Sequence, residues 1–265
     1  EALDYWERLL ALEEDPVIRE HSWRLAAQLF EFERAIPLLV TLSEMRQLTT
    51  EELDALVYSY ESLGEPEEEE QWLRSYLKAQ PNQQLAWVRL QQLLERTQQF
   101  QAETEAWAQL DKRFGLSPAD RVSWAQTHWK LFDEDAAWRV MAAKNANAEK
   151  ITDPEYWRVR AELAWITEND QDTQDSYERL LGLGAPLYSS DREQLLTIYQ
   201  TSNPQKALAL LVEFWNARHK PDRLVSALDL AEKLGDWEQY AALVEGAQKI
   251  PGTEKLPVLW NARAV

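Results

Sequence analysis

Bulky and small residues recur along this chain with a period close to 34 residues. A near-constant period of that length is typical of a solenoid of helix pairs, in which each repeat contacts mainly its neighbours. We therefore expect function to lie in an extended surface and not in one deep pocket. One repeated helix position, with steps of 34, 34, 34, 36, 34 and 33 residues, is occupied by Trp23, Val57, Gln91, Ala125, Ala161, Leu195 and Leu228.

The second repeat shows the helical pattern most clearly. Its apolar residues fall at i, i+3, i+4 and i+7, which places them on one face of a helix. We expect Thr50 to cap this helix and Gly64 to end it. The apolar face consists of Leu53, Leu56, Val57 and Tyr60.

The period predicts seven helix pairs between two partial repeats. Residues 1–15 are expected to be a partial helix of a preceding repeat, and residues 252–265 a partial repeat at the C-terminus, so we expect a piece of a longer protein. The 36-residue step, over residues 144–154, predicts a longer second helix or a loop. The seven pairs cover residues 16–48, 49–81, 82–116, 117–152, 153–187, 188–220 and 221–251.

The order of large and small residues within each repeat resembles the tetratricopeptide repeat (TPR). The large residue early in the first helix is Leu53, Trp87, Trp157 or Leu224, and the small residue of the second helix is Ala35, Ala137, Thr173 or Ala207. Glu69, Glu103 and Tyr240 replace that small residue, so we expect looser or shifted packing there. The resemblance covers nearly the whole chain. It implies an all-α fold, a right-handed superhelical solenoid of about seven TPR-like helix pairs.

Charge and composition narrow the choice of partners. The chain carries 28 basic and 46 acidic residues, a net charge of −18, which repels phosphate backbones and favours a basic protein or a cationic polymer. The same charge could serve only to keep a solenoid with open ends soluble. The chain has no cysteine, which excludes disulfides and thiol catalysis. No run of about 18 apolar residues predicts a membrane span.

Catalytic patterns are weak. His21, His128 and His219 lie about three repeats apart, and His128 falls on an apolar packing face, where a packing role is expected. No His, Asp and Glu cluster has metal-ligand spacing, and no glycine-rich loop precedes a helix. We therefore expect no enzyme activity, no cofactor and no metal. An α-helical carbohydrate-active enzyme is the alternative, although such enzymes have longer and less regular periods.

Thirteen tryptophans are many for 265 residues. Trp23, Trp87, Trp107, Trp157 and Trp237 occupy positions expected to pack between helices. In TPR proteins the groove is formed by the first helix of each pair, and this register predicts a row of aromatic and polar residues there. Such residues suit protein segments or sugar rings, unless register drift buries them. The predicted groove consists of Arg24, Asp54, Tyr58, Gln92, Arg96, Gln126, Trp129, Arg158, Glu162, Trp165, Arg192 and Tyr199.

These features favour a non-catalytic scaffold that docks a protein partner. The acidic, cysteine-free, Gln- and Trp-rich repeats also resemble the periplasmic TPR region of bacterial exopolysaccharide export outer-membrane proteins. The resemblance is greatest to the Pel-type exporter, and next to the cellulose and poly-N-acetylglucosamine exporters. That resemblance implies a periplasmic polysaccharide-modifying enzyme as partner and a role in guiding a cationic polysaccharide in biofilm export. A cytoplasmic or periplasmic adaptor unrelated to polysaccharide is the alternative. A TPR protein that clamps an acidic peptide terminus is disfavoured by the acidic surface.

Overall fold

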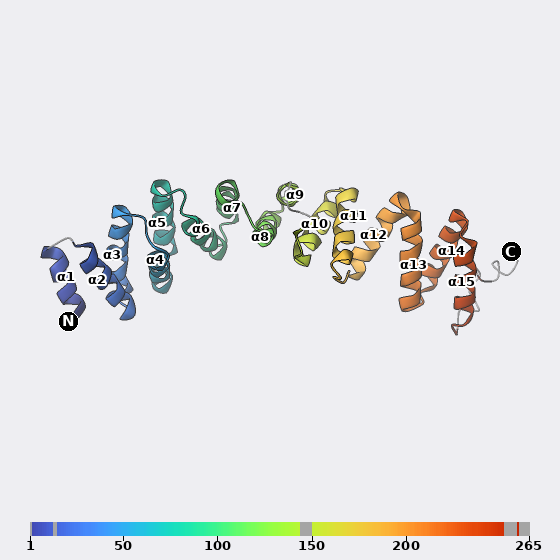
Figure 1. The fold of residues 1–265 in the computed structure, drawn as a ribbon, viewed down its shortest axis with the longest axis horizontal. Helices are drawn as coiled ribbons and strands as arrows, with labels where there is room; N and C mark the ends of the chain where they lie inside the picture. The colour runs from blue at the N-terminus through green and yellow to red at the C-terminus, as the bar shows by residue number, and fades with distance from the viewer. Residues whose placement is uncertain (1, 13–14, 144–149, 252–258, 260–265) are drawn as a thin grey trace. The chain divides into compact units, whose positions relative to one another are not determined.

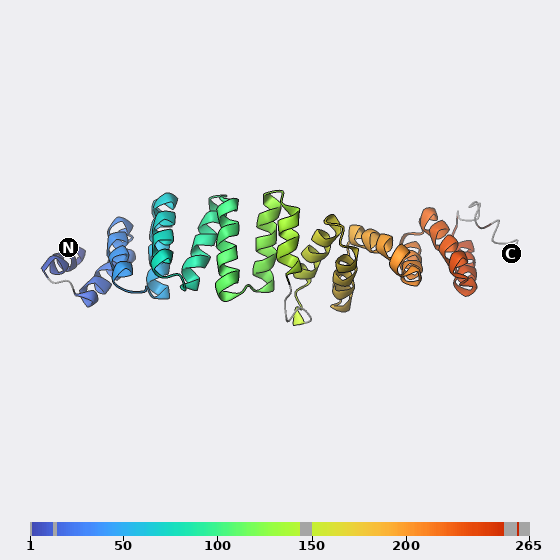
Figure 2. The ribbon, with the colours of Figure 1, turned by 90° about the horizontal axis from the view of Figure 1, so that it is seen from above.

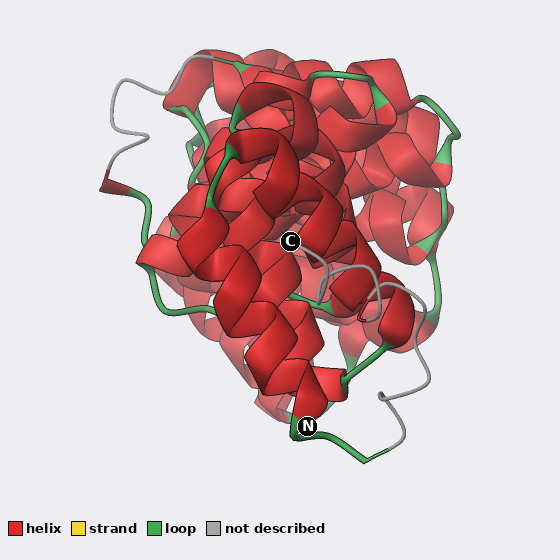
Figure 3. Ribbon diagram, turned by 90° about the vertical axis from the view of Figure 1, so that its right-hand side faces the viewer, coloured by secondary structure: helices red, strands yellow, loops and turns green. Residues whose placement is uncertain are grey.

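The described segments of the chain are entirely helical. The structure is a computed structural model that describes residues 2–12, 15–143, 150–251 and 259. These residues contain fifteen α-helices and no strand, which confirms the all-α prediction (Figures 1 and 3). The chain divides into two compact units, Glu1–Val140 and Met141–Val265, and each is considered by itself.

The helices follow one another in pairs, whose first member we call helix A and whose second we call helix B. Each of the seven expected ranges contains one pair. In unit 1, α1 (Ala2–Leu12) precedes the pairs α2 (Pro16–Gln28) and α3 (Phe32–Met45), α4 (Thr50–Leu63) and α5 (Pro66–Ala79), α6 (Gln84–Arg96) and α7 (Phe100–Phe114), and α8 (Pro118–Lys130) and α9 (Glu134–Ala142). The last two residues of α9 belong to unit 2. In unit 2 the pairs are α10 (Pro154–Ile166) and α11 (Asp170–Gly182), α12 (Ser189–Ser202) and α13 (Pro204–Arg218), and α14 (Pro221–Leu234) and α15 (Trp237–Gln248).

The 36-residue step follows α9. This helix B has only 9 residues and ends at Ala142. The two extra residues of this repeat therefore do not lengthen α9. Most of the expected insertion, residues 144–149, lies outside the described residues.

Small residues let the two helices of a pair approach closely. Ala35, Ala137 and Ala207, at the small position of helix B, are all fully buried. Four residues further on, Leu39 and Leu211 fill the space on the same helix face and are 0% and 1% exposed. Burial of a leucine stabilises the folded chain by about 1.5–3 kcal/mol, so each repeat depends on its neighbours to cover this face.

The turn from helix A to helix B has the same backbone conformation in six of the seven pairs. One residue adopts a left-handed conformation, and the next N–H donates to a carbonyl five residues earlier, as in Glu31 to Ala26 (2.9 Å) and Gln99 to Leu94 (2.8 Å). In the exception, Asn203 has φ −153° and Pro204 starts α13 at once. The left-handed residues are Phe30, Gly64, Gln98, Phe132, Glu168 and Gly235, with φ between 58° and 71°.

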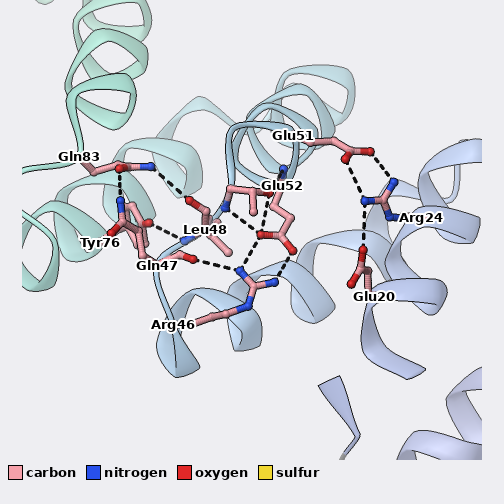
Figure 4. A network of polar contacts seen from close by, with 10 residues as sticks. Glu20, Arg24, Arg46, Gln47, Leu48, Glu51, Glu52, Tyr76 and Gln83 are labelled. Atoms are coloured by element: carbon pink, nitrogen blue, oxygen red, sulfur yellow. Dashed lines mark hydrogen bonds and ion pairs between the residues drawn. The ribbon is translucent and has the colours of Figure 1, made fainter. Parts of the chain in front are cut away.

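A polar network closes the turn from α3 to α4 (Figure 4). Thr49 Oγ1 accepts from the N–H of Glu52 at 3.3 Å, and Glu52 Oε2 accepts from the N–H of Thr49 at 2.9 Å. The predicted cap at Thr50 is therefore wrong by one residue, because Thr49 has the extended backbone that a cap requires. Glu52 also accepts from the Arg46 guanidinium at 2.8 Å, which lowers the pKa of this buried carboxyl to about 2.

The same turn is tied to the next two helices. The N–H of Leu48 donates to the Tyr76 hydroxyl of α5 at 2.9 Å, and its carbonyl accepts from Gln83 Nε2 at 3.2 Å (Figure 4). Because Leu48 is 2% exposed, an unpaired backbone group there would be costly. Side chains from the following repeat boundary therefore complete this turn.

The left-handed turns generate a first prediction. Phe132 is 87% exposed with φ 58°, a conformation that costs a non-glycine residue about 1–2 kcal/mol. Phe132→Gly relieves this strain and should raise the free energy of unfolding by about 0.5–1 kcal/mol. Phe132→Ala loses the same exposed ring but keeps the strain, so it should bring no gain. Urea unfolding followed by circular dichroism measures both, and equal stability of the two variants would contradict this explanation.

Candidate functional site

Helix A of unit 1 exposes one repeated position. Tyr58 on α4, Gln92 on α6 and Gln126 on α8 follow one another at 34-residue steps and are all exposed, Tyr58 at 56%. Each lies one residue after the packing position, about 100° around the helix from the buried face. Arg24 holds the same position on α2 and is half-buried. Three of the predicted groove residues of unit 1 therefore form a solvent-exposed series.

The predicted charged residues of unit 1 instead connect neighbouring repeats. Each forms an ion pair with a carboxylate or guanidinium about 27–35 residues away, so these side chains are not free for a partner. The exposed pairs among them contribute about 0–1 kcal/mol each, and Arg96–Glu69 differs because its carboxylate is buried. The pairs are Arg24–Glu51 (2.7 Å), Asp54–Arg89 (2.7 Å), Arg96–Glu69 (2.8 Å) and Arg96–Glu61.

Unit 2 uses its predicted charged residues in a similar way. Arg158 of α10 binds Asp191 of α12 at 2.7 Å, and both side chains are largely covered. Arg192 binds Glu213 of α13 at 2.6 Å. Glu162 is exposed, and its pKa is raised by partial burial and then by the carboxylate of Asp191. The predicted charged residues of unit 2 are Arg158, Glu162 and Arg192. Among the described residues, Glu162 alone of these three forms no ion pair.

The predicted row of four exposed aromatics is partly wrong. Tyr199 is 5% exposed, and its hydroxyl donates to Glu178 at 2.9 Å; burial raises its pKa. Trp129 and Trp165 are half-buried, which leaves Tyr58 as the exposed ring. The physical reason is helical geometry: Trp129, Trp165 and Tyr199 lie four residues after the packing position, one turn along the same face.

The tryptophans assigned to packing follow expectation with one exception. Trp23, Trp107 and Trp157 are buried, and Trp87 is partly buried. Trp237 is 53% exposed, so its predicted packing role is wrong. It is the first residue of α15, where the chain has only begun to pack.

A hollow of about 250 Å³ lies between α6, α7 and α8 of unit 1. It is lined by the predicted residue Gln92, by the carboxylates of Glu95 and Asp120, and by the indole of Trp107. Among the described residues none that lines this hollow is basic, although Lys130 Nζ lies 3.6 Å from Glu95. The hollow therefore suits hydrogen-bond donors and cationic groups. Glu95 is not among the predicted groove residues, although its position corresponds to that of Trp129 in the next repeat.

A buried carboxyl joins the helices around this hollow. Glu103, at the small position of α7, is 1% exposed. Its Oε1 accepts from Gln91 Nε2 of α6 at 2.9 Å, Trp107 Nε1 at 3.1 Å and Thr127 Oγ1 of α8 at 2.9 Å. The expected loosening at Glu103 does not occur, because the carboxyl fills the space and satisfies donors from three helices.

Glu69 has a related role in the preceding repeat. It is 1% exposed at the small position of α5, and Arg96 of α6 donates to it at 2.8 Å. Burial raises its pKa to about 7, although the Arg96 charge opposes that shift. Acidic residues thus replace alanine at two successive helix-B positions and bind the following helix A.

The described residues hold no group of three or more His, Asp or Glu side chains that could bind a metal ion. His128 is half-buried beside Trp124, at 6.0 Å between ring centroids, and burial lowers its pKa. This placement agrees with the packing role expected for it. Within the described ranges of the chain, no helix is long and apolar enough to cross a membrane.

Comparison with known proteins identifies the family. A family model described as tetratricopeptide repeat matches residues 109–265, more than half of the chain. The chain belongs to the tetratricopeptide repeat family. No curated protein matches its sequence.

Solved structures add to this at the level of the fold. A chain in the structure of Naa15/Naa10 bound to HypK-THB is 12% identical, with a TM-score of 0.50, over 93% of this TPR chain and 43% of that chain. MamA 41-end from Desulfovibrio magneticus RS-1 is 13% identical over 61% of this chain and 90% of that one, with a TM-score of 0.42. At 12% identity the likeness to the first of these chains concerns the fold alone.

The Glu103 network yields a prediction about stability. Glu103→Ala leaves the buried N–H donors of Gln91 and Trp107 without this acceptor, whereas Thr127 can still donate to the Ser123 carbonyl at 3.0 Å. The substitution should lower the free energy of unfolding by about 2–3 kcal/mol. Glu103→Gln keeps an acceptor oxygen of the same size, so it should stay within about 1 kcal/mol of the parent protein. Urea unfolding with tryptophan fluorescence compares them. Equal losses in the two variants would show that the hydrogen bonds to Glu103 contribute nothing.

Proposed function

We propose that this TPR protein is a non-catalytic scaffold that docks a protein partner on the helix-A surface of unit 1. The observation that carries the proposal is the pairing of an exposed series, Tyr58, Gln92 and Gln126, with the hollow beside Gln92. The charged residues around them are held in ion pairs between repeats, whereas these three side chains are neutral and exposed. Gln92 Oε1 accepts from Arg89 at 2.8 Å, and the Tyr58 ring lies 5.6 Å from that of Phe32. An aromatic ring with amide neighbours suits a peptide segment, because it offers both apolar area and hydrogen bonds.

The charge of unit 1 bears on the kind of partner. Residues 1–140 contain 27 acidic and 14 basic residues, a net charge of −13. A basic segment would be attracted to this surface, and its Lys or Arg side chains would meet Glu95 and Asp120 in the hollow. We therefore propose a partner with a basic docking segment.

The finer proposal concerns the cellular setting. We propose that the protein works in the bacterial periplasm as a component of an exopolysaccharide secretion machine, where its partner is a polysaccharide-modifying enzyme. The net charge of −18 supports this setting, because an acidic surface suits a partly deacetylated, cationic polysaccharide. Such a polymer could be guided along the same surface.

Photo-crosslinking in cells tests both levels. Benzoyl-phenylalanine in place of Tyr58 or Gln126, on helix A, should crosslink one defined protein. The same group in place of Glu67 or Glu105, exposed on helix B, should not. Deacetylated glucosamine oligomers should reduce the yield from permeabilised cells, whereas acetylated oligomers should leave it unchanged.

The outcomes separate the proposals. Equal crosslinking from helix A and helix B positions would contradict docking on this surface. A crosslinked partner that is cytoplasmic would be consistent with the scaffold function but would refute the periplasmic setting. A crosslinking yield that the cationic oligomers leave unchanged would refute only the proposed role in guiding a polymer.

A further inference from the structure

The net charge is spread unevenly over the chain. Residues 141–265 contain 19 acidic and 14 basic residues, a net charge of −5, against −13 for residues 1–140. Four of these basic residues line a single hollow of about 300 Å³: Arg192, Arg218, Lys220 and Arg223. Where basic residues gather around one hollow of an acidic protein, that hollow attracts negatively charged ligands, whereas the surface as a whole attracts positively charged ones.

The hollow forms where three helix ends meet. α12 begins at Ser189, α13 ends at Arg218 and α14 begins at Pro221, so residues from two repeats surround one space. Leu187 and Phe214 add apolar side chains to the lining. The volume is at the lower end of the ~300–1,000 Å³ typical of ligand pockets, enough for one or two side chains of a peptide.

Two of the four cations are already bound to carboxylates. Arg192 binds Glu213 at 2.6 Å, and Arg223 binds Glu193 at 2.6 Å. The Arg223 guanidinium also lies 5.5 Å from the centre of the Phe214 ring. These contacts hold both arginines in place, and Glu193 is itself part of the lining.

The other two cations lack such partners. Arg218 donates to Ser189 Oγ at 3.5 Å, and neither Arg218 nor Lys220 forms an ion pair among the described residues. Lys220 precedes α14 and makes no side-chain cap to it. Both side chains are exposed, so their charges remain available to a ligand.

We propose that this hollow, which we call the cationic pocket, binds an acidic segment of a protein partner. One Asp or Glu carboxylate would lie between Arg218 and Lys220, and an adjacent apolar side chain would contact Phe214 and Leu187. Charge complementarity selects this occupant. The lining holds four cations and one carboxylate, Glu193. Glu213 and Asp222 also pair with Arg192 and Arg223, at 2.6 and 3.8 Å, which leaves the two cations without an ion pair among the described residues, Arg218 and Lys220, to attract a carboxylate. The inference rests on the proposed scaffold function and adds a second contact of opposite charge, in unit 2.

Under this proposal the cationic pocket departs locally from the expectation that overall acidity disfavours an acidic ligand. Charges more than about 8 Å away are largely screened at physiological ionic strength. The lining of the pocket then outweighs the distant carboxylates of unit 1 in deciding what binds there.

Fluorescence anisotropy with a dye-labelled peptide tests the proposal on the full chain. The probe is a short Glu-rich peptide with one central Phe, and the matched controls replace its Glu residues by Gln or by Lys. The Glu peptide should bind at least about tenfold more tightly than the Gln peptide, and the preference should shrink as salt rises from about 50 to about 500 mM. A Glu peptide that binds no better than its Gln or Lys counterpart would overturn the proposal.

Charge reversal assigns the binding to the pocket. Lys220→Glu should weaken the Glu peptide by about tenfold or more, whereas Lys233→Glu, the same charge change on exposed α14 outside the pocket, should stay within about twofold. Circular dichroism checks that both variants fold, and Arg218→Gln provides a milder variant. Equal effects of Lys220→Glu and Lys233→Glu would refute the site. A phosphoserine peptide that binds about tenfold more tightly than the Glu peptide would refute the choice of carboxylate.

The failures are distinguishable. Loss of the pocket result with helix-A crosslinking intact would overturn only this inference. Peptide binding at the pocket without any helix-A crosslink would overturn only the docking surface proposed for unit 1.

Discussion

The structure depends on one constraint: no helix pair of this chain can bury its apolar face alone. Each pair is covered by the next, because successive helices from α1 to α8 and from α10 to α15 contact one another (Figure 2). Fully buried Ala35 and Ala207 allow the close approach, and the leucines four residues later fill the interface. Stability is therefore a sum of intrinsic repeat terms and interfaces between neighbours.

Polar side chains reinforce these interfaces where the small residue is missing. Glu69 binds Arg96 of the following helix A, and Glu103 joins α6, α7 and α8. Each buried carboxyl requires donors in fixed places, so it specifies which neighbour can pack there. Ion pairs on the exposed side, such as Asp54–Arg89, link the same neighbours. The surface left for partners consists of what these contacts do not use.

The 34-residue period predicts most of this fold, because the position of Leu or Ala within a repeat depends on helical geometry alone. Individual exposures are harder to predict: Tyr199 is buried because it lies one turn after Leu195, and Trp237 is exposed because it begins a helix. The cationic pocket could not be predicted from the net charge, because a sum over the whole chain does not show where positive charges gather. Its residues come together only where the ends of α12, α13 and α14 meet.

The stability of each repeat in this chain thus depends on its contacts with adjacent repeats and not on a common core. Amide hydrogen exchange in a Leu90→Ala variant tests this most directly, because Leu90 of α6 is 2% exposed and its truncation should cost about 2–5 kcal/mol. We predict that exchange speeds up from α4 to α8 and stays unchanged from α12 to α15. Equal acceleration in α12 to α15 would contradict transmission between neighbouring repeats.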